Sequence, residues 1–206
     1  MAGNSDTKQR GRSSGSNSSD SAFSFGGGSA GVLAGAALAG AAIGIAANVG
    51  RKLFVQFSTG ATGDWCDALT AEHALTRTIF DKIEATDDSQ GIMRGHLLTK
   101  LKYALAKHAN EEENVVYPAL REANMAHDAD ALNGEHGYVK TYLYELETIT
   151  NTSPEWLARV RDFRTMIEEH MRMEEEEVFP AFRKVLSEEQ NARLTSMMNK
   201  EGFKMA

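Results

Sequence analysis

The sequence predicts an all-α protein: an up-and-down antiparallel four-helix bundle with a short C-terminal fifth helix and a disordered, Gly/Ala-rich N-terminal extension. From Trp65 onward, apolar residues recur at the spacing i, i+3, i+4 and i+7, while glycine and proline are rare and strand-like alternation is missing. The connections between these stretches are short, and short connections between long amphipathic helices make neighbouring helices antiparallel.

Five stretches are expected to be helices, over roughly 64–85, 90–125, 129–150, 154–186 and 187–203. Ser153-Pro154 is a strong start signal, because serine caps free amide groups and proline is tolerated at the first helical position. The letters SEEQ from Ser187 are typical of a capping box at the start of the fifth helix.

The N-terminal part has a different composition. Residues 1–28 are rich in Ser, Gly and Asn and are expected to be a disordered tail. Residues 29–62 form a Gly/Ala-rich apolar segment and linker, within which residues 31–50 are long enough to span or contact a membrane. A flexible linker and a small-residue helix that packs or self-associates are the alternatives. We therefore expect a cytoplasmic protein, with membrane association as the alternative.

Composition limits the function. The chain has 206 residues, enough for one domain with an appendage. Its formal net charge of −7 argues against a general nucleic-acid binder, because affinity for phosphate comes from clustered Lys and Arg. Cys66 is the only cysteine, so an intrachain disulfide is impossible, and we expect it to be a small buried apolar residue.

The predicted bundle contains an internal repeat. The letters KHANEEENVVYPAL (107–120) align without a gap on EHMRMEEEEVFPAF (169–182), and EHALTRTIFDKIE (72–84) aligns on EHGYVKTYLYELE (135–147). Each half therefore has one histidine on its first helix and a His-x-x-x-Glu pair on its second. Two such hairpins packed antiparallel are related by a pseudo-twofold axis, so equivalent residues can meet at the bundle centre.

The repeated residues are metal-ligand types. The spacing i, i+4 places each histidine and glutamate of a His-x-x-x-Glu pair on one helix face, and imidazole and carboxylate bind iron, manganese or zinc. Charges buried together without a cation cost several kcal/mol per ion. We predict a dinuclear centre in which each glutamate bridges and each metal takes the histidines of one hairpin. The candidate ligands are His73, His108, Glu112, His136, His170 and Glu174.

Each feature has an ordinary structural alternative. A single His-x-x-x-Glu pair is common by chance, but its recurrence with the same flanking residues favours a metal site. The other carboxylates of the acidic run, Glu168, Glu169, Glu175, Glu176 and Glu177, are expected to be solvated or salt-bridged. His96 and His127 lack a repeat counterpart and are not expected to be ligands. We expect Tyr103, Phe80, Tyr138, Phe163 and Phe179 in the core, and spacing alone does not select a tyrosine near the metals.

Each half of the repeat has a His, then a His-x-x-x-Glu pair followed by an aromatic residue and Pro. This ordered pattern resembles the hemerythrin-like family, also called HHE cation-binding domains. The resemblance covers Trp65 to about Leu186 and makes residues 63–206 a hemerythrin-like domain. It implies two non-haem Fe ions with an oxo or hydroxo bridge. By that resemblance His73 and His108 ligate one iron, His136 and His170 ligate the other, and Glu112 and Glu174 bridge.

One position departs from the oxygen-carrying members, which have a second histidine on the third helix. Lys140 occupies that place here, so each metal keeps an open position unless a residue such as Glu72 or Glu135 fills it. Lys140 and its repeat partner Arg77 are expected either to extend toward solvent or to orient neighbouring carboxylates.

The resemblance implies a protein that binds or senses O2, peroxide or NO, and an open site also suits peroxide reduction, a peroxidase- or catalase-like activity. The alternatives are an iron storage or sensing protein, and a structural scaffold that uses the Gly/Ala segment. No nucleic-acid partner is expected. The physiological ligand and the oligomeric state do not follow from the sequence.

Overall fold

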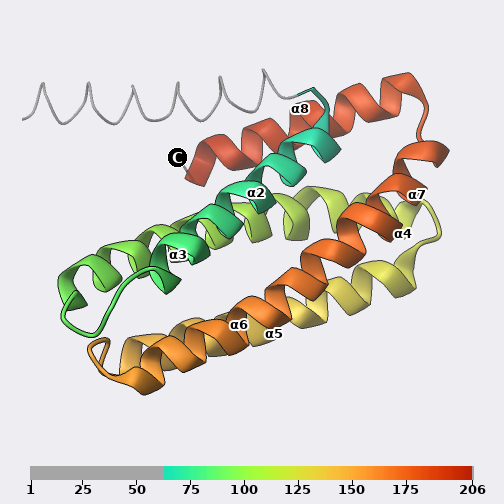
Figure 1. Ribbon diagram of the computed structural model, residues 1–206. Helices are drawn as coiled ribbons and strands as arrows, with labels where there is room; N and C mark the ends of the chain where they lie inside the picture. Colours follow the sequence, from blue (N-terminus) through green and yellow to red (C-terminus); the bar gives the residue numbers. More distant parts are fainter. Residues whose placement is uncertain (1–62, 206) are drawn as a thin grey trace, which may run out of the picture. The chain divides into compact units, whose positions relative to one another are not determined.

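The computed structural model describes residues 63–205, and the predicted all-α fold is confirmed there (Figure 1). The elements are α2 (Trp65–Glu84), α3 (Gly91–Glu111), the π-helical segment η1 (Glu112–Val116), α4 (Tyr117–Glu122), α5 (Ala126–Thr148), α6 (Pro154–Met173), the π-helical segment η2 (Glu174–Val178), α7 (Phe179–Val185) and α8 (Glu188–Met205). The predictions for residues 1–62, including membrane contact through 31–50, lie outside the described residues.

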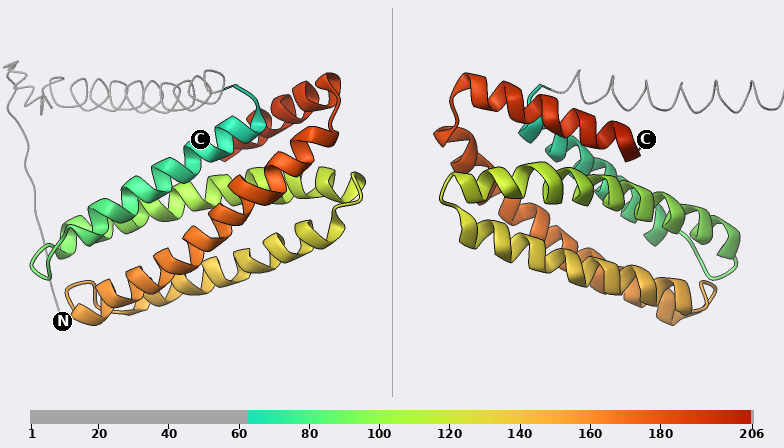
Figure 2. Two further views of the ribbon diagram at one scale, coloured as in Figure 1. Left: turned by 45° about the vertical axis from the view of Figure 1, so that its right-hand side comes forward. Right: turned by 180° about the vertical axis from the view of Figure 1, so that it is seen from behind.

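The helices form two antiparallel hairpins. In the first, α2 packs against α3, and in the second α5 packs against α6. The two hairpins pair through α2 with α6 and through α4 with α5, which closes the four-helix bundle (Figure 2). The fifth helix, α8, packs mainly on α3, η1 and α2 of the first hairpin. Among the described helices, none is long and apolar enough to cross a membrane.

Local start signals place these helices as predicted. The Ser153 hydroxyl accepts a hydrogen bond from the Trp156 amide, and Pro154 occupies the first position of α6. Before α8, the Ser187 hydroxyl accepts from the Gln190 amide, while the Gln190 side chain accepts from the Ser187 amide, which is the predicted capping box. Each bond satisfies an amide that has no partner within its helix.

Two apolar clusters enclose a polar layer. One cluster packs around Trp65 with Phe179 and Phe182, and the other packs around Phe80 with Phe163. On α2, α3 and α5 the buried His and Glu residues lie between residues of the two clusters, and on α6 they lie between Ile167 and Val178. The bundle therefore holds its polar residues between two hydrophobic layers that exclude water from both ends.

The core predictions for Phe80, Phe163 and Phe179 are confirmed, but those for two tyrosines are wrong. Tyr138 lies on the outer face of α5 and is exposed. Tyr103 is also exposed, and its hydroxyl donates to the Met205 carbonyl at the end of α8. In both cases the side chain is on the face of its helix that turns away from the bundle axis. Cys66 is half-buried, and burial raises the pKa of its thiol.

Candidate metal centre

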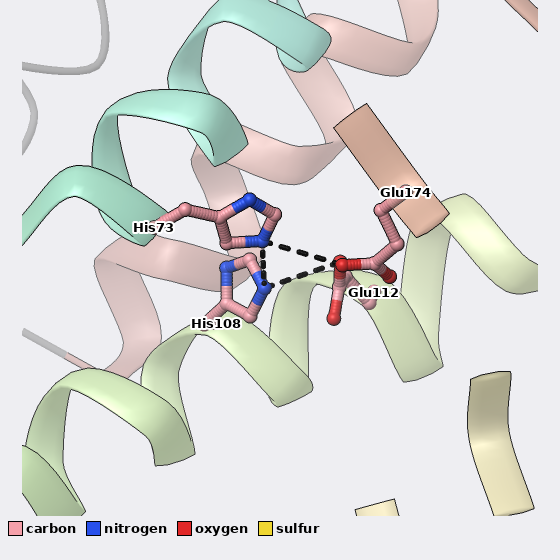
Figure 3. Close-up of side chains that lie close together, drawn as sticks. All are labelled: His73, His108, Glu112 and Glu174. Atoms are coloured by element: carbon pink, nitrogen blue, oxygen red, sulfur yellow. Dashed lines mark hydrogen bonds and ion pairs between the residues drawn. The ribbon is translucent and has the colours of Figure 1, made fainter. Parts of the chain in front are cut away.

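Four histidines, one from each long helix of the bundle, meet in the polar layer. The Nε2 atoms of His73 on α2 and His108 on α3 are 2.9 Å apart (Figure 3). His136 on α5 and His170 on α6 form the equivalent pair of the second hairpin, with ring centroids 5.2 Å apart. All four are buried. The structure therefore groups the histidines by hairpin, in the arrangement that the repeat predicts.

The two predicted bridging carboxylates lie between the histidine pairs. Glu112 places Oε1 3.3 Å from His108 Nε2 and Oε2 3.3 Å from His136 Nε2, so its carboxylate spans the hairpins. Glu174 Oε2 lies 3.3 Å from His73 Nε2 and 3.4 Å from His170 Nε2. Both glutamates are fully buried. All six candidate residues thus face one another across the bundle axis.

A π-helical turn begins at each of these glutamates. The Tyr117 amide donates to the Glu112 carbonyl and the Phe179 amide donates to the Glu174 carbonyl, five residues back instead of four. The proline that follows, Pro118 or Pro180, has no N–H and its ring clashes with the carbonyl of a regular α-helix. Widening the turn relieves the clash, and π-turns of this kind are frequent at functional sites. Helical periodicity does not predict these π-turns, although the repeated proline is a signal for them in the sequence.

Each histidine also contacts a carboxylate through its other ring nitrogen. The Nδ1 atoms of His73 and His136 lie 2.8 Å and 2.9 Å from Glu175 and Glu113. The Nδ1 atoms of His108 and His170 lie 3.1 Å and 2.7 Å from Glu72 and Glu135. A carboxylate that accepts from Nδ1–H leaves the Nε2 lone pair directed at the centre.

These outer carboxylates extend the sequence prediction. Glu72 and Glu135, considered as extra ligands, instead contact Nδ1 atoms, and the acidic-run residue Glu175 contacts His73 besides forming a salt bridge. The repeat aligns Glu72 with Glu135 and Glu113 with Glu175, so it already contained this signal.

Arg77 and Lys140 lie one turn after His73 and His136, and their side chains behave differently. One orients a neighbouring carboxylate and the other extends toward solvent. Arg77 donates to Glu175 at 2.9 Å and to Glu168 at 2.9 Å, so it orients the carboxylate that contacts His73. Lys140 is 70% exposed and reaches Glu113 only at 3.4 Å, so it extends toward solvent. Among the remaining candidates, His96 and His127 are exposed and lie outside the cluster.

Tyr117 also lies at this centre, a position that the sequence patterns do not predict. It is fully buried, and its hydroxyl lies 3.0 Å from Glu174 Oε1, 3.2 Å from Glu112 Oε2 and 3.2 Å from His136 Nε2. Burial, with the two carboxylates adding to it, raises the pKa of this phenol well above its usual range. The hydroxyl therefore keeps its proton and donates it toward the bridging carboxylates.

The electrostatics of the layer fit a cation. Burial alone would raise the pKa of Glu112, but the neighbouring His108 and His136 hold it well below the usual range. Burial likewise opposes the charged form of His108, yet Glu112 and Glu72 raise its pKa well above the usual range. Among the described side chains, three buried atoms here have no hydrogen-bond partner: Glu112 Oε1, His170 Nε2 and Glu174 Oε2. Buried polar atoms without partners are costly, and metal ions bound at the centre would satisfy all three.

The donor atoms fall into two groups. One contains His73, His108, Glu112 and Glu174, and the other contains Glu112, His136 and His170, with the atoms of each group within 4.8 Å of one another. Glu112 belongs to both groups, which is the arrangement of a bridging ligand. Oxygen and imidazole nitrogen donors in this number suit Fe, Mn or Zn.

A cavity of about 10 Å³ adjoins the centre. Its walls comprise the four histidines and Thr76, Leu105, Ala109, Val139, Ile167 and Met171. Because the four candidate ligand histidines form part of its wall, this space belongs to the candidate metal site itself.

A family model described as the Hemerythrin HHE cation binding domain matches residues 66–182 of this chain. A protein of this family from Mycobacterium kansasii has a similar solved structure, with a TM-score of 0.62, 22% sequence identity, and coverage of 69% of this chain and 87% of that one. That likeness supports the fold alone.

Two curated relatives are similar in sequence. A DNA nickase of Nostoc sp. is 30% identical over 124 residues, which is 60% of this chain and 35% of the nickase. A hemerythrin-like protein of Schizosaccharomyces pombe is 25% identical over 134 residues, which is 63% of this chain and 64% of that protein. The chain thus spans less than two thirds of the length of either relative.

Proposed function

Because the chain belongs to the hemerythrin HHE cation binding domain family, we propose that it is a non-haem di-iron protein that binds or senses O2, peroxide or NO, with peroxide reduction as a further activity to be tested. The observation that supports this most is the buried set of four histidines and two glutamates, three of whose atoms lack hydrogen-bond partners in the described chain.

The six residues would hold two ions. His73 and His108 serve one position, His136 and His170 serve the other, and Glu112 and Glu174 extend between them. A bound pair of iron ions supplies the electrons and the Lewis acidity that reactions of O2, peroxide and NO require. The protein's part is to fix the ligands and to exclude water.

Three features of the chain fix the ligands and exclude water. The four outer carboxylates hold the Nδ1 protons and thereby fix the tautomer of every histidine. Tyr117 directs a hydroxyl proton at the two bridging carboxylates. The two apolar clusters on either side of the centre keep bulk water out of the bundle axis.

Metal analysis of the aerobically purified protein, with an absorption spectrum before and after peroxide, tests the proposal. We expect two irons per chain and near-ultraviolet absorption from a bridged ferric pair, with spectral changes on adding peroxide. A chain that holds no iron, or that shows no absorption beyond its aromatic residues, would contradict it.

Iron storage is the alternative class, and iron stoichiometry separates it from the proposal. The buried ligand set is sufficient for a pair of ions, so we expect two irons per chain at any iron supply. An iron content that rises with supply well beyond two would favour storage.

One relative is a DNA nickase, and this chain aligns with only 35% of its length. We expect no activity on DNA here, because a net charge of −7 opposes binding to phosphate. Incubation of supercoiled plasmid with the iron-loaded protein checks this, and relaxation that depends on the metal would contradict the expectation.

A further inference from the structure

We infer that the two metal positions are unequal: the position at His73 and His108 retains its ion, whereas the position at His136 and His170 exchanges its ion readily. The inference rests on the di-iron function proposed above and concerns how that centre is loaded and emptied. It is carried by differences between the two hairpins in the partners of the outer carboxylates and in the helix that covers them.

The donor sets of the two positions are alike. Glu112 lies 3.3 Å from both His108 and His136, and Glu174 Oε2 lies 3.3 Å from His73 Nε2 and 3.4 Å from His170 Nε2. Each position therefore has two histidines and access to both glutamates. The difference between the positions lies in the residues that hold these histidines.

At the first position, basic side chains hold the outer carboxylates in place. Glu72, which contacts His108, forms an ion pair with Lys107, and Lys107 also donates to Glu111 at 2.6 Å. Lys107 is nearly buried and Glu111 is fully buried. The Lys107 ammonium cannot leave these two carboxyl groups without placing an unpaired charge in an apolar interior, so Glu72 is fixed against His108.

The other histidine of this position is supported in the same way. Glu175, which contacts His73, accepts hydrogen bonds from two nitrogens of Arg77, at 2.9 Å and 3.3 Å. A two-point contact between guanidinium and carboxylate fixes orientation as well as distance. Both histidines of the first position therefore have an outer carboxylate that is itself held in place.

At the second position the outer carboxylates have weaker partners. Glu135, which contacts His170, is 35% exposed and has no cationic partner among the residues that the structure describes. Glu113, which contacts His136, is paired only with the exposed Lys140 at 3.4 Å. The repeat positions of Lys107 and Glu111 are occupied here by Glu169 and Met173, which cannot form the same pair.

Helix α8 adds a cover to the first hairpin. It lies along α2 and α3, on the side of the bundle away from α5 and α6 (Figure 2). Gly202 of α8 sits so close that a Cβ atom there would be 1.9 Å from Glu111 Oε1 and 3.2 Å from Lys107 Cε. The missing side chain at Gly202 thus lets α8 seal the Lys107–Glu111 pair from water.

These differences predict two rates of metal loss. Changing the partners of metal-binding histidines typically costs about 10–100-fold in metal affinity. One position has such partners held by Lys107 and Arg77, whereas the partners at the other position have only the exposed Lys140 or no cation among the described residues. We therefore expect the second position to lose its ion at least about 10-fold faster than the first.

Release of iron to an excess of EDTA from the full-length iron-loaded protein tests the inference, after the iron content has been measured. Two phases are expected, each of one iron per chain. Lys107→Met should accelerate the slow phase by about 10-fold or more and leave the fast phase unchanged. The matched control is Glu169→Met, which alters the exposed residue at the same repeat position and should change neither phase.

A second pair of variants acts through the covering helix and keeps both ionic residues. Gly202→Ala should also accelerate the slow phase, because its Cβ must displace Glu111. Gly134→Ala on α5 is the control, since no atom lies within 4 Å of the Cβ it adds.

The outcomes separate this inference from the function it rests on. Two irons released in a single phase, or a Lys107→Met variant in which only the fast phase changes, would overturn the inference and leave the di-iron centre intact. A chain that binds no iron would overturn both. Two phases with the slow one sensitive to Lys107 and Gly202 would support the inference.

Discussion

Replacing Tyr117 by phenylalanine removes one hydroxyl from the centre of the bundle. The hydroxyl lies 3.0 Å from Glu174 Oε1 and 3.2 Å from Glu112 Oε2, and it is also 3.2 Å from His136 Nε2. The side chain is fully buried, so no water replaces these contacts. The aromatic ring should stay in place, because the repeat position of Tyr117 is occupied by the buried Phe179.

The expected cost follows from these contacts. One hydroxyl proton can be donated to only one or two acceptors, and a hydrogen bond to a charged group contributes about 1.5–3 kcal/mol. Ring burial is unchanged, so no apolar contribution is lost. We expect the metal-free Tyr117→Phe protein to lose about 2 kcal/mol of unfolding free energy.

Urea denaturation of the metal-free protein, followed by far-ultraviolet circular dichroism, measures this difference. Tyr138→Phe is the control, because Tyr138 is exposed on α5 and its hydroxyl should contribute little. A loss below about 0.5 kcal/mol for Tyr117→Phe, the ordinary range of a surface substitution, would refute the argument that its hydroxyl is bonded to the carboxylates. An equal loss in the control would do the same.

Three further predictions concern ligands, metal and pH. His108→Ala or His170→Ala should sharply lower the iron measured by atomic absorption, whereas His96→Ala or His127→Ala should not, because the last two side chains are exposed outside the cluster. Removing iron should lower the melting temperature, since a metal at 100 times its Kd stabilises by about 2.7 kcal/mol; equal melts with and without iron would contradict buried ligation. Burial and the nearby Glu72 raise the pKa of Glu111 from 4.5 to about 8, against the effect of Lys107. The folded protein therefore binds more protons than the unfolded chain in this range, so the contribution of Glu111 is fully present below pH 4.5 and is lost as the pH rises through about 8. Glu111→Gln should reduce this loss, seen as a smaller decrease in urea stability between pH 5.5 and 8 in the metal-free protein; an unchanged pH dependence would refute it.

Most of the fold and the meeting of the six candidate residues could be predicted because both follow from periodicity. The i, i+4 spacing of His108 and Glu112 puts them on one face, and the apolar residues around them turn that face inward. The repeat then brings the second hairpin to the same centre. Capping chemistry placed the starts of α6 and α8, since a serine hydroxyl acts on amides within one turn of itself.

The errors concern details that periodicity does not determine. Tyr103 and Tyr138 were assigned to the core by residue type, but the phase of each helix turns them outward. The repeat aligns Tyr117 with Phe179, and this alignment gives no sign that the Tyr117 hydroxyl contacts both Glu112 and Glu174. Its direction depends on the π-turn that starts at Glu112, which a regular helical pattern does not contain.

The inequality of the two hairpins shows why a repeat in sequence does not imply equivalence in structure. Lys107 and Glu111 differ from Glu169 and Met173 by ordinary substitutions at second-helix positions. Only the packing of α8, which begins after the repeat has ended, places one of these pairs in an interior where charge must remain paired. On the other hairpin Glu169 stays exposed and pairs with Arg172 across one turn, a contact that contributes little. The added helix thus converts a small difference between the halves into a difference in how firmly each holds its histidines.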